Sequence, residues 1–353
     1  MRNQDSRRRW IDPRFAALTL DQRGPFIRLS NDRLMAVDGN ATVTSCDGGT
    51  TWSEPQPIFV TERCEVPESG LGIPSSSGQL LRTRSDTLLL VWKDPKELNW
   101  DAEAGDIGPG SRGDGWSIRS VDGGTTWIDR QRIYAGVIGH PPINMIQTSS
   151  GRIVVSLQPM IPNPGRNAVL TYSSADDGAT WRPSNLIDLG GQGHHGGGFE
   201  PTFIQLKNGR LWMLIRSNLD RFWQAYSDDD GLYWRTIEPS PIEASTSPGY
   251  LTRLDSGRIV LAWNRLYPEG KQTFPRRSGQ FSEVLASWHR EELSLSFSED
   301  EGDTWTKPIM VVREKDTWIS YPYVFEPKAG TIWLMTRQGG LSVQAQESDL
   351  LQQ

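Results

Sequence analysis

The sequence predicts an all-β fold, a six-bladed β-propeller of four-stranded antiparallel blades. Three observations favour it: a turn motif that recurs five times, a turn-and-strand motif that recurs six times, and a high content of glycine and tryptophan. The 35 glycines and 15 tryptophans suit many short strands that are joined by tight turns and packed by aromatic rings. Few segments have helical periodicity, so we expect little helix.

The turn motif has the pattern S-x-D-x-G-x-x-W. It occupies residues 45–52, 120–127, 174–181, 227–234 and 298–305. Aspartate forms turns by accepting hydrogen bonds from backbone amides, and glycine tolerates the positive φ of a tight turn. The tryptophan is expected to pack back on the apolar face of its blade. We therefore interpret these aspartates as structural, on the outer rim, and not as catalytic.

The second motif is a turn followed by an apolar strand. Its six copies lie at residues 30–37, 84–92, 149–157, 207–215, 255–263 and 328–335. Their turn positions are 48 to 73 residues apart, which is the size of one four-stranded blade with its loops. Six copies therefore predict six blades around a central funnel, where we expect any chemistry to take place.

The repeats define one domain. We expect an N-terminal tail at 1–18, a single propeller at 19–345 and a C-terminal tail at 346–353. Two long stretches inside the propeller, 94–115 and 267–282, have no repeat of their own. They are too long to be idle connections, and we interpret them as lids or substrate walls.

Composition excludes several functions. The chain has 37 basic and 43 acidic residues and a net charge of −6, so it lacks the basic surface that nucleic acid requires. No long apolar run predicts a membrane span, and the compartment stays open. Two cysteines, Cys46 and Cys64, are too few for a disulfide framework or a cysteine-rich zinc site. We expect no metal and no cofactor.

The five boxes and six strands resemble the sialidase (neuraminidase) superfamily over roughly residues 20–340. The resemblance implies the propeller fold. It does not by itself fix the activity, because lyases, other glycosidases and non-catalytic lectin-like propellers also carry such boxes. The activity has to be argued from the site residues.

Sialidases hold the substrate carboxylate with three arginines, since planar guanidinium groups form bidentate bonds to carboxylates. The resemblance implies Arg23, in an Arg-Gly-Pro sequence, Arg216, and Arg290 just before the last box. We expect them at strand ends in a solvated funnel. For Arg290, an ion pair with Glu291 or Glu292 is the alternative.

The resemblance places the nucleophile at Tyr321, with Tyr323 in reserve, and its base at Glu200. A tyrosine suits a sugar whose anomeric carbon already carries a carboxylate. An anionic nucleophile would be repelled there, whereas a neutral phenol deprotonated by Glu200 arrives uncharged.

The general acid of the family is an aspartate on a loop before the first box. Only Asp38 lies in that interval, followed by Gly39, and Asp-Gly is also a hairpin-turn signal. Asp94, which opens a long loop, is the substitute.

Three histidines suggest other readings. His140, His194 and His195 lie in loops rich in glycine and proline. A pair such as His195 with Tyr321 would suit β-elimination of a uronate polysaccharide or hydrolysis of a uronate sugar, with the arginines neutralising the carboxylate. A carbohydrate-binding propeller that lacks the acid is the non-enzymatic alternative, favoured by the short loop at Asp38.

Together these residues predict an exo-glycosidase. Its expected substrate is a glycan that ends in an α-linked sialic acid or a similar carboxylated sugar.

Overall fold

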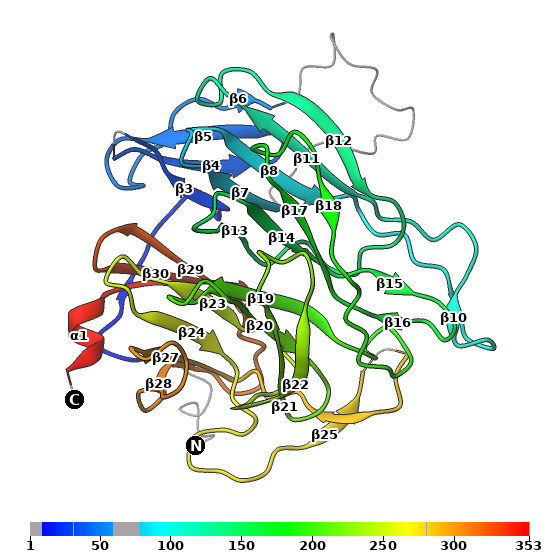
Figure 1. Ribbon diagram of the computed structural model, residues 1–353. Helices are drawn as coiled ribbons and strands as arrows, with labels where there is room; N and C mark the ends of the chain where they lie inside the picture. The colour runs from blue at the N-terminus through cyan, green and yellow to red at the C-terminus, as the bar shows by residue number, and fades with distance from the viewer. Residues whose placement is uncertain (1–8, 31, 59–77, 280, 353) are drawn as a thin grey trace.

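The computed structural model describes residues 9–30, 32–58, 78–279 and 281–352. Six antiparallel sheets, each with four blade strands, surround a central axis (Figure 1). The only helix among the described residues is the short α1 (Glu347–Leu351). The expected six-bladed, all-β propeller is therefore confirmed. Cys46 is an exposed free thiol, and Cys64 lies outside the described residues.

The blades use the strands in chain order from the axis outward. Blade 1 contains β3 (Phe26–Arg28), β4 (Leu34–Asp38), β5 (Ala41–Ser45) and β6 (Gln56–Pro57). Blade 2 contains β7 (Gly78–Arg82), β8 (Leu88–Lys93), β11 (Gly115–Ser120) and β12 (Ile128–Tyr134). Blade 3 contains β13 (Met145–Gln147), β14 (Ile153–Leu157), β17 (Leu170–Ser174) and β18 (Arg182–Pro183).

The second half of the ring repeats this order, except that the outermost strand of blade 6 comes from the N-terminal part of the chain. Blade 4 contains β19 (Phe199–Gln205), β20 (Leu211–Arg216), β21 (Arg221–Ser227) and β22 (Arg235–Glu243). Blade 5 contains β23 (Tyr250–Arg253), β24 (Ile259–Trp263), β27 (Glu292–Ser298) and β28 (Ile309–Arg313). Blade 6 contains β29 (Ser320–Lys328), β30 (Thr331–Gln338), β31 (Ser342–Gln346) and β2 (Ala16–Ala17).

Both ends of the described chain belong to the ring. β2 pairs with β31 as the outermost strand of blade 6, and β1 (Trp10–Ile11) pairs with β28 of blade 5. At the other end, Leu350 of α1 is buried in the core between these two blades. The structure thus differs from the tails expected at 1–18 and 346–353. The physical reason is that β31 would otherwise present an unpaired edge.

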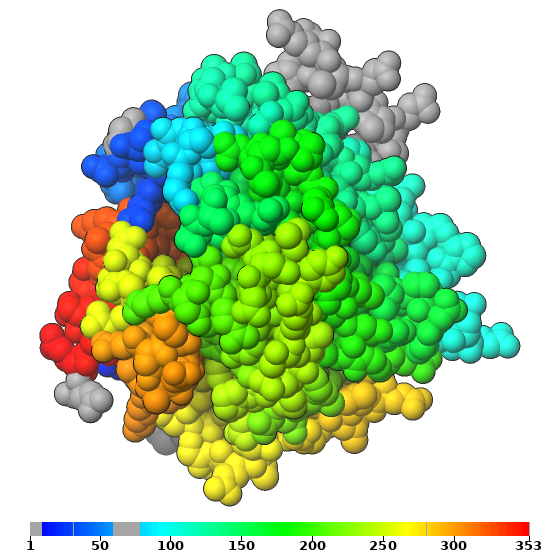
Figure 2. Space-filling model, in the orientation of Figure 1, coloured from blue at the N-terminus to red at the C-terminus, as the bar shows by residue number. Residues whose placement is uncertain are grey.

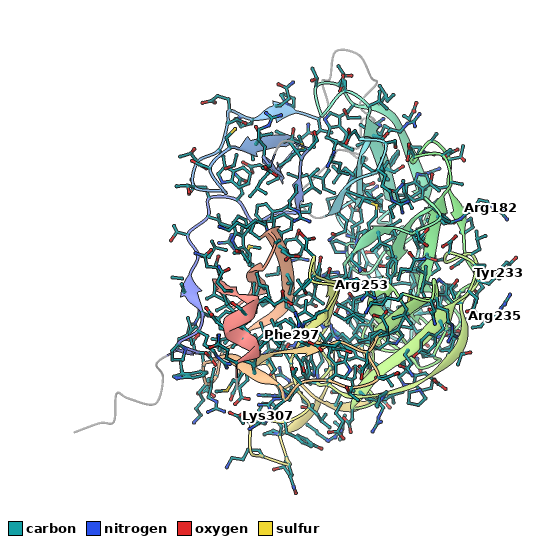
Figure 3. The ribbon with its side chains drawn as sticks, turned by 60° about the vertical axis from the view of Figure 1, so that its left-hand side comes forward. Arg182, Tyr233, Arg235, Arg253, Phe297 and Lys307 are labelled. Atoms are coloured by element: carbon teal, nitrogen blue, oxygen red, sulfur yellow. The ribbon has the colours of Figure 1, made fainter. Side chains whose placement is uncertain are left out.

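The core is divided among the junctions between blades. Six hydrophobic clusters are present in the described chain, and each combines residues of two neighbouring blades. Phe297 of blade 5, labelled in Figure 3, is one such buried residue. By contrast, Arg182, Tyr233 and Arg235 point into solvent from the outer edge of blades 3 and 4 (Figure 3).

The five boxes form the same turn between the third and fourth strands. In the third box, Ser174 Oγ accepts the amide proton of Gly178 at 2.8 Å, and Asp176 Oδ1 accepts that of Thr180 at 2.8 Å. Gly178 has φ +80°, and a Cβ there would lie 2.2 Å from Leu89 of the preceding blade. The box therefore requires glycine both for its conformation and for close packing.

Blade 6 explains why six blades have five boxes. Its third strand, β31, leads into α1, while its fourth strand comes from the N-terminal side of the chain. No third-to-fourth turn exists there. Glu347 of α1 contacts the neighbouring blade 5 instead: its carboxylate accepts a hydrogen bond of 2.6 Å from Ser256.

The strand directions separate the two ends of the ring. The boxes and the turns between first and second strands lie at one end, which leaves the other connections at the opposite end. All the predicted site residues belong to this second end. The insertions after β8 and after β24 also start there, and they project from the body in cyan and yellow in Figure 2. We call this end the site face.

Three short hairpins enlarge the site face. They are formed by β9 (Trp100–Asp101) with β10 (Asp106–Ile107), β15 (Met160–Ile161) with β16 (Arg166–Asn167), and β25 (Arg276–Ser278) with β26 (Leu285–Ser287). The rings of Trp100 and Phe281 stack with centroids 5.1 Å apart, which joins the first hairpin to the third.

Candidate active site

Tyr321 and Glu200 meet at the centre of the site face. The phenolic hydroxyl of Tyr321 donates a hydrogen bond of 2.9 Å to Oε1 of Glu200. Each residue lies at the start of an innermost strand, β29 or β19. Both have positive φ, +60° for Tyr321 and +50° for Glu200, which is costly for side chains larger than glycine. Such strain is typical of residues whose side chains are held for function.

Arg216 completes this group from the end of β20. Its Nη1 lies 2.5 Å from Oε2 of Glu200 and 3.4 Å from the hydroxyl of Tyr321. Its Nε and Nη2 donate to Thr246 Oγ1 at 3.2 and 3.1 Å. The guanidinium also lies over the ring of Phe199, 4.3 Å from its centroid. One arginine therefore touches both expected catalytic residues.

Arg290 lies beside this group and is 2% exposed. It donates to the backbone carbonyl of Thr246 at 2.8 Å and to Gln338 at 2.9 Å. Its guanidinium stacks on Trp288 and Trp318, at 5.1 and 4.7 Å from the ring centroids. Burial and the neighbouring Arg216 lower the pKa of Arg290 to about 10. Its Nε has no hydrogen-bond partner among the described residues.

The alternative for Arg290 was an ion pair with an adjacent glutamate. Glu292 instead binds Arg313 at 2.6 Å, and Glu291 accepts the amide proton of Asp316 at 3.0 Å. Arg290 thus points to the centre of the ring and not toward its sequence neighbours.

The expectation of a solvated funnel around Arg216 and Arg290 is wrong. Arg216 is 1% exposed, and the tryptophans over Arg290 are covered in turn by Arg277 of β25. The cause is the insertion after β24, which folds back over the arginines. Sequence periodicity carries no information about the path of such an insertion.

The charges on the central pair follow from its surroundings. Burial would raise the pKa of Glu200, but the guanidinium of Arg216 and the nearby His140 outweigh it and hold that pKa at about 2. Burial and the Glu200 carboxylate raise the pKa of Tyr321. At neutral pH, the pair is therefore a carboxylate and a protonated phenol.

An open cavity of about 760 Å³ adjoins Tyr321. His140 and Arg337 line it, as do Arg23 and Asp38. Arg23 is exposed and has no ion-pair partner in the described parts of the chain. Asp38 is exposed at a two-residue turn, where it pairs with Ala41. It is thus both a turn residue and a residue of the cavity.

Asp94 and Tyr323 have different surroundings. Asp94 is 1% exposed, and its carboxylate accepts a hydrogen bond of 2.7 Å from the indole of Trp116. The hydroxyl of Tyr323 accepts the amide proton of Phe26 at 3.0 Å, and burial raises the pKa of this tyrosine. Tyr323 therefore joins blade 6 to blade 1, while Tyr321 faces Glu200.

His140 is the histidine next to Tyr321. Their rings stack with centroids 5.1 Å apart. The Nδ1 of His140 lies 2.8 Å from the carbonyl of Pro141, and its Nε2 lies 3.2 Å from Nη1 of Arg337. Burial lowers the pKa of His140 to about 4, so at neutral pH it donates from Nδ1 and accepts at Nε2.

The other two histidines have their ring contacts with residues other than Tyr321. The ring of His195 packs edge-on against Trp288, 5.1 Å away, and against Phe199. His194 Nε2 lies 2.5 Å from Nζ of Lys96. The structure thus brings His140, and not His195, onto the face of Tyr321.

Sequence reasoning missed Arg337 and Lys93, although the repeat contains their signal. Arg216 stands seven positions after its turn glycine. It lies at the C-terminal end of the second strand of its blade, at the site face. The same position is polar in all but the first blade. These residues form a ring around the axis: Lys93, Gln158, Arg216, Asn264 and Arg337. Thr246, Trp288 and Trp318 come from connections without such a repeat.

The described residues contain no group of three or more His, Cys, Asp or Glu side chains placed to hold a metal ion. In the same ranges, no helix has the length and apolar character that crossing a bilayer would need. The central residues Tyr321 and Glu200 can themselves supply acid–base and nucleophilic chemistry. A carboxylate beside a phenol can take its proton, and the guanidinium between them stabilises the negative charge in either position.

Fold and central residues together define a sialidase-like propeller. The model of the BNR repeat-like domain matches residues 47–334, and the chain belongs to this family. No curated protein matches the sequence significantly.

Solved structures share the fold at low identity. A protein of unknown function from Dyadobacter fermentans DSM 18053 is 16% identical, with a TM-score of 0.62 over 95% of this chain and 100% of that one. The Hadza microbial sialidase Hz136 is 15% identical, with a TM-score of 0.60 over 93% and 66%. The intramolecular trans-sialidase from Ruminococcus gnavus, solved with oseltamivir carboxylate, is 15% identical, with a TM-score of 0.54 over 93% and 94%.

Proposed function

We propose that the protein is an exo-glycosidase that removes a terminal carboxylated sugar, such as an α-linked sialic acid, from a glycan. The observation that carries the proposal is the hydrogen bond of 2.9 Å from Tyr321 to Glu200, with Arg216 in contact with both. The names of similar structures, among them a sialidase and a trans-sialidase, agree with this substrate class.

The proposed reaction begins at Tyr321. Its phenolic proton passes to Glu200 while the phenolate oxygen bonds to the anomeric carbon. The bond from that carbon to the leaving oxygen breaks, and Asp38, in its acid form, protonates the leaving oxygen. Water then attacks the glycosyl–tyrosine, Asp38 takes a proton from this water, and Glu200 returns its proton to Tyr321. Two displacements retain the configuration of the sugar.

The arginines account for the carboxylate preference. A substrate carboxylate can compete for the N–H groups of Arg216 that now donate to Thr246 and Glu200. Weakening the bond from Arg216 to Glu200 raises the pKa of Glu200 above its value of about 2, which makes Glu200 a better base. Binding of the correct substrate would thus activate the nucleophile.

A second candidate is supported by the stacking of His140 on Tyr321. A neutral histidine and a tyrosine could share the proton transfers of β-elimination from a uronate polysaccharide. The products differ, because elimination leaves an unsaturated uronate and hydrolysis does not.

A paired assay tests both candidates. One arm follows the release of a fluorogenic leaving group from an α-sialoside, and the other follows unsaturated uronate by its ultraviolet absorbance. Sialoside turnover that vanishes in Tyr321→Phe supports the hydrolase. Absorbance that vanishes in His140→Gln supports the lyase. Silence of the purified, folded protein in both arms, over a panel of carboxylated sugars, favours a carbohydrate-binding propeller.

A further inference from the structure

Three cations lie at the site face on either side of blade 1, and one of them, Arg337, lines the cavity. Lys93 is the last residue of β8 in blade 2, and Lys96 follows it in the connection. Arg337 is the second-to-last residue of β30 in blade 6. The connection of blade 1 between them is only the two-residue turn after Asp38, so this side of the site face stays open. We call these three residues the cation cluster.

Each member has neutral hydrogen-bond partners. Lys93 Nζ donates to the carbonyl of Asp94 at 2.6 Å. Lys96 Nζ lies 2.5 Å from His194 Nε2, and Arg337 Nη1 lies 3.2 Å from His140 Nε2. Burial lowers the pKa of both histidines to about 4, so at neutral pH each ring is uncharged and its Nε2 can accept a hydrogen bond from the neighbouring cation.

None of the three has a carboxylate within salt-bridge distance among the described residues, although most other arginines near the surface do. Lys93 is only 8% exposed. Burial, together with the charges of Lys96 and Arg337, lowers its pKa to about 8. The carboxylate of Asp94 acts against this shift at Lys93, and that of Glu200 does the same at the half-buried Lys96, but neither cancels the effect of burial. Keeping Lys93 charged in a buried position beside two other cations costs free energy, which a bound anion would recover.

The cluster is placed to act together with the central arginines. Lys93 and Arg337 occupy the same position of the repeat as Arg216, where the second strand of each blade reaches the site face. Blade 2, which carries the two lysines, stands opposite blade 5, which carries Arg290, in a ring of six. A ligand with two anionic groups could therefore bind one on each side of Tyr321.

We propose that Lys93, Lys96 and Arg337 form a second anion subsite, which binds a carboxylate or sulfate group on the sugar next to the one that is cleaved. The inference rests on the proposed function for its cleavage step and narrows the substrate to a glycan with at least two anionic groups. The prediction that an anion binds there depends only on the three residues of the cation cluster, and not on the proposed cleavage.

Binding can be measured without turnover. In the Tyr321→Phe protein, calorimetry with inorganic sulfate and with glucuronate as separate probes should show saturable binding. Lys96→Met and Arg337→Met should each weaken the binding of the preferred probe by at least about tenfold, because each removes a charged donor. Arg182→Met is the matched control, since this exposed arginine lies on the outer edge of blade 3. It should leave binding unchanged.

The pH dependence adds an independent readout. Because the pKa of Lys93 is about 8, anion binding should weaken as the pH rises through 8. Unchanged binding in Lys96→Met and Arg337→Met, or an equal loss in Arg182→Met, would overturn the subsite. Anion binding without turnover of any sugar would leave the subsite intact and count against the hydrolase. Turnover that shows no preference for a second anionic group would support the hydrolase and overturn the subsite.

Discussion

Tyr321 and Glu200 are 121 residues apart in the sequence, yet the phenol donates to the carboxylate across 2.9 Å. They come from the innermost strands of blades 6 and 4, and Arg216 contacts both. The pair therefore exists only when these blades share one axis.

Replacing Tyr321 by phenylalanine removes one hydroxyl from the centre. The ring can still stack on His140, so the fold should be kept. Turnover of a sialoside should fall by at least about a thousandfold, since no other described group takes the place of the nucleophile. Mass spectrometry with a slow fluorinated sugar should trap a covalent adduct on the unmodified protein and none on Tyr321→Phe. An adduct on another residue would contradict the assignment.

Arg216 should matter for stability as well as for activity. Arg216→Met leaves the carboxylate of Glu200 buried without its cation, and such a loss costs about 3–5 kcal/mol of unfolding free energy. The double variant Arg216→Met/Glu200→Gln removes both charges and should recover most of it. Denaturant unfolding of the four proteins measures the coupling. Additive effects would show that the two charges do not depend on each other.

The protonation of His140 should limit activity in acid. Its Nε2 accepts from Arg337 only while the ring is neutral, and its pKa is about 4. As the pH falls through 4, the ring gains a charge next to Arg337 and should leave Tyr321. The activity should therefore have an acid limb near pH 4, which moves to lower pH in His140→Gln. An unmoved limb would assign the titration to another group.

The N-terminal strands should stabilise the ring. Deleting residues 1–18 removes β1, β2 and the buried Phe15, which alone contributes about 1.5–3 kcal/mol. The Tm should fall by several degrees. Deleting only residues 1–8 keeps both strands and serves as the control. Equal Tm values for the two truncated proteins would mean that the strand pairing contributes little.

The fold could be predicted because its signals are local and repeated. Each box contains in eight residues the serine, aspartate, glycine and tryptophan that make its turn, and the second motif counts the blades. Ring closure could not be predicted this way. The two residues of β2 have no strand pattern of their own, and only the open edge of β31 determines their pairing.

The structure brings Glu200, Arg216 and Tyr321 into contact, and their sequence positions were fixed by the repeat or by the resemblance. Their catalytic roles stay predictions. Features of the site that depend on the path of a loop were not predictable. The burial of Arg290 is one of them, because the insertion after β24 brings Trp288 onto its guanidinium. Likewise, His140 and His195 stand in similar loops, and only the three-dimensional structure brings one of them to Tyr321.

The pairing of β2 with β31 also limits the order of folding. Arg9 and the carbonyl of Gly339, 330 positions later, share a hydrogen bond. During synthesis, the first blades can stack while later ones are still being made, but the ring stays open until the last strand has been translated. Contacts of such long sequence separation form slowly. The pair of Tyr321 and Glu200 would therefore be assembled late, and an arrested nascent chain would expose an unpaired strand edge, which favours aggregation.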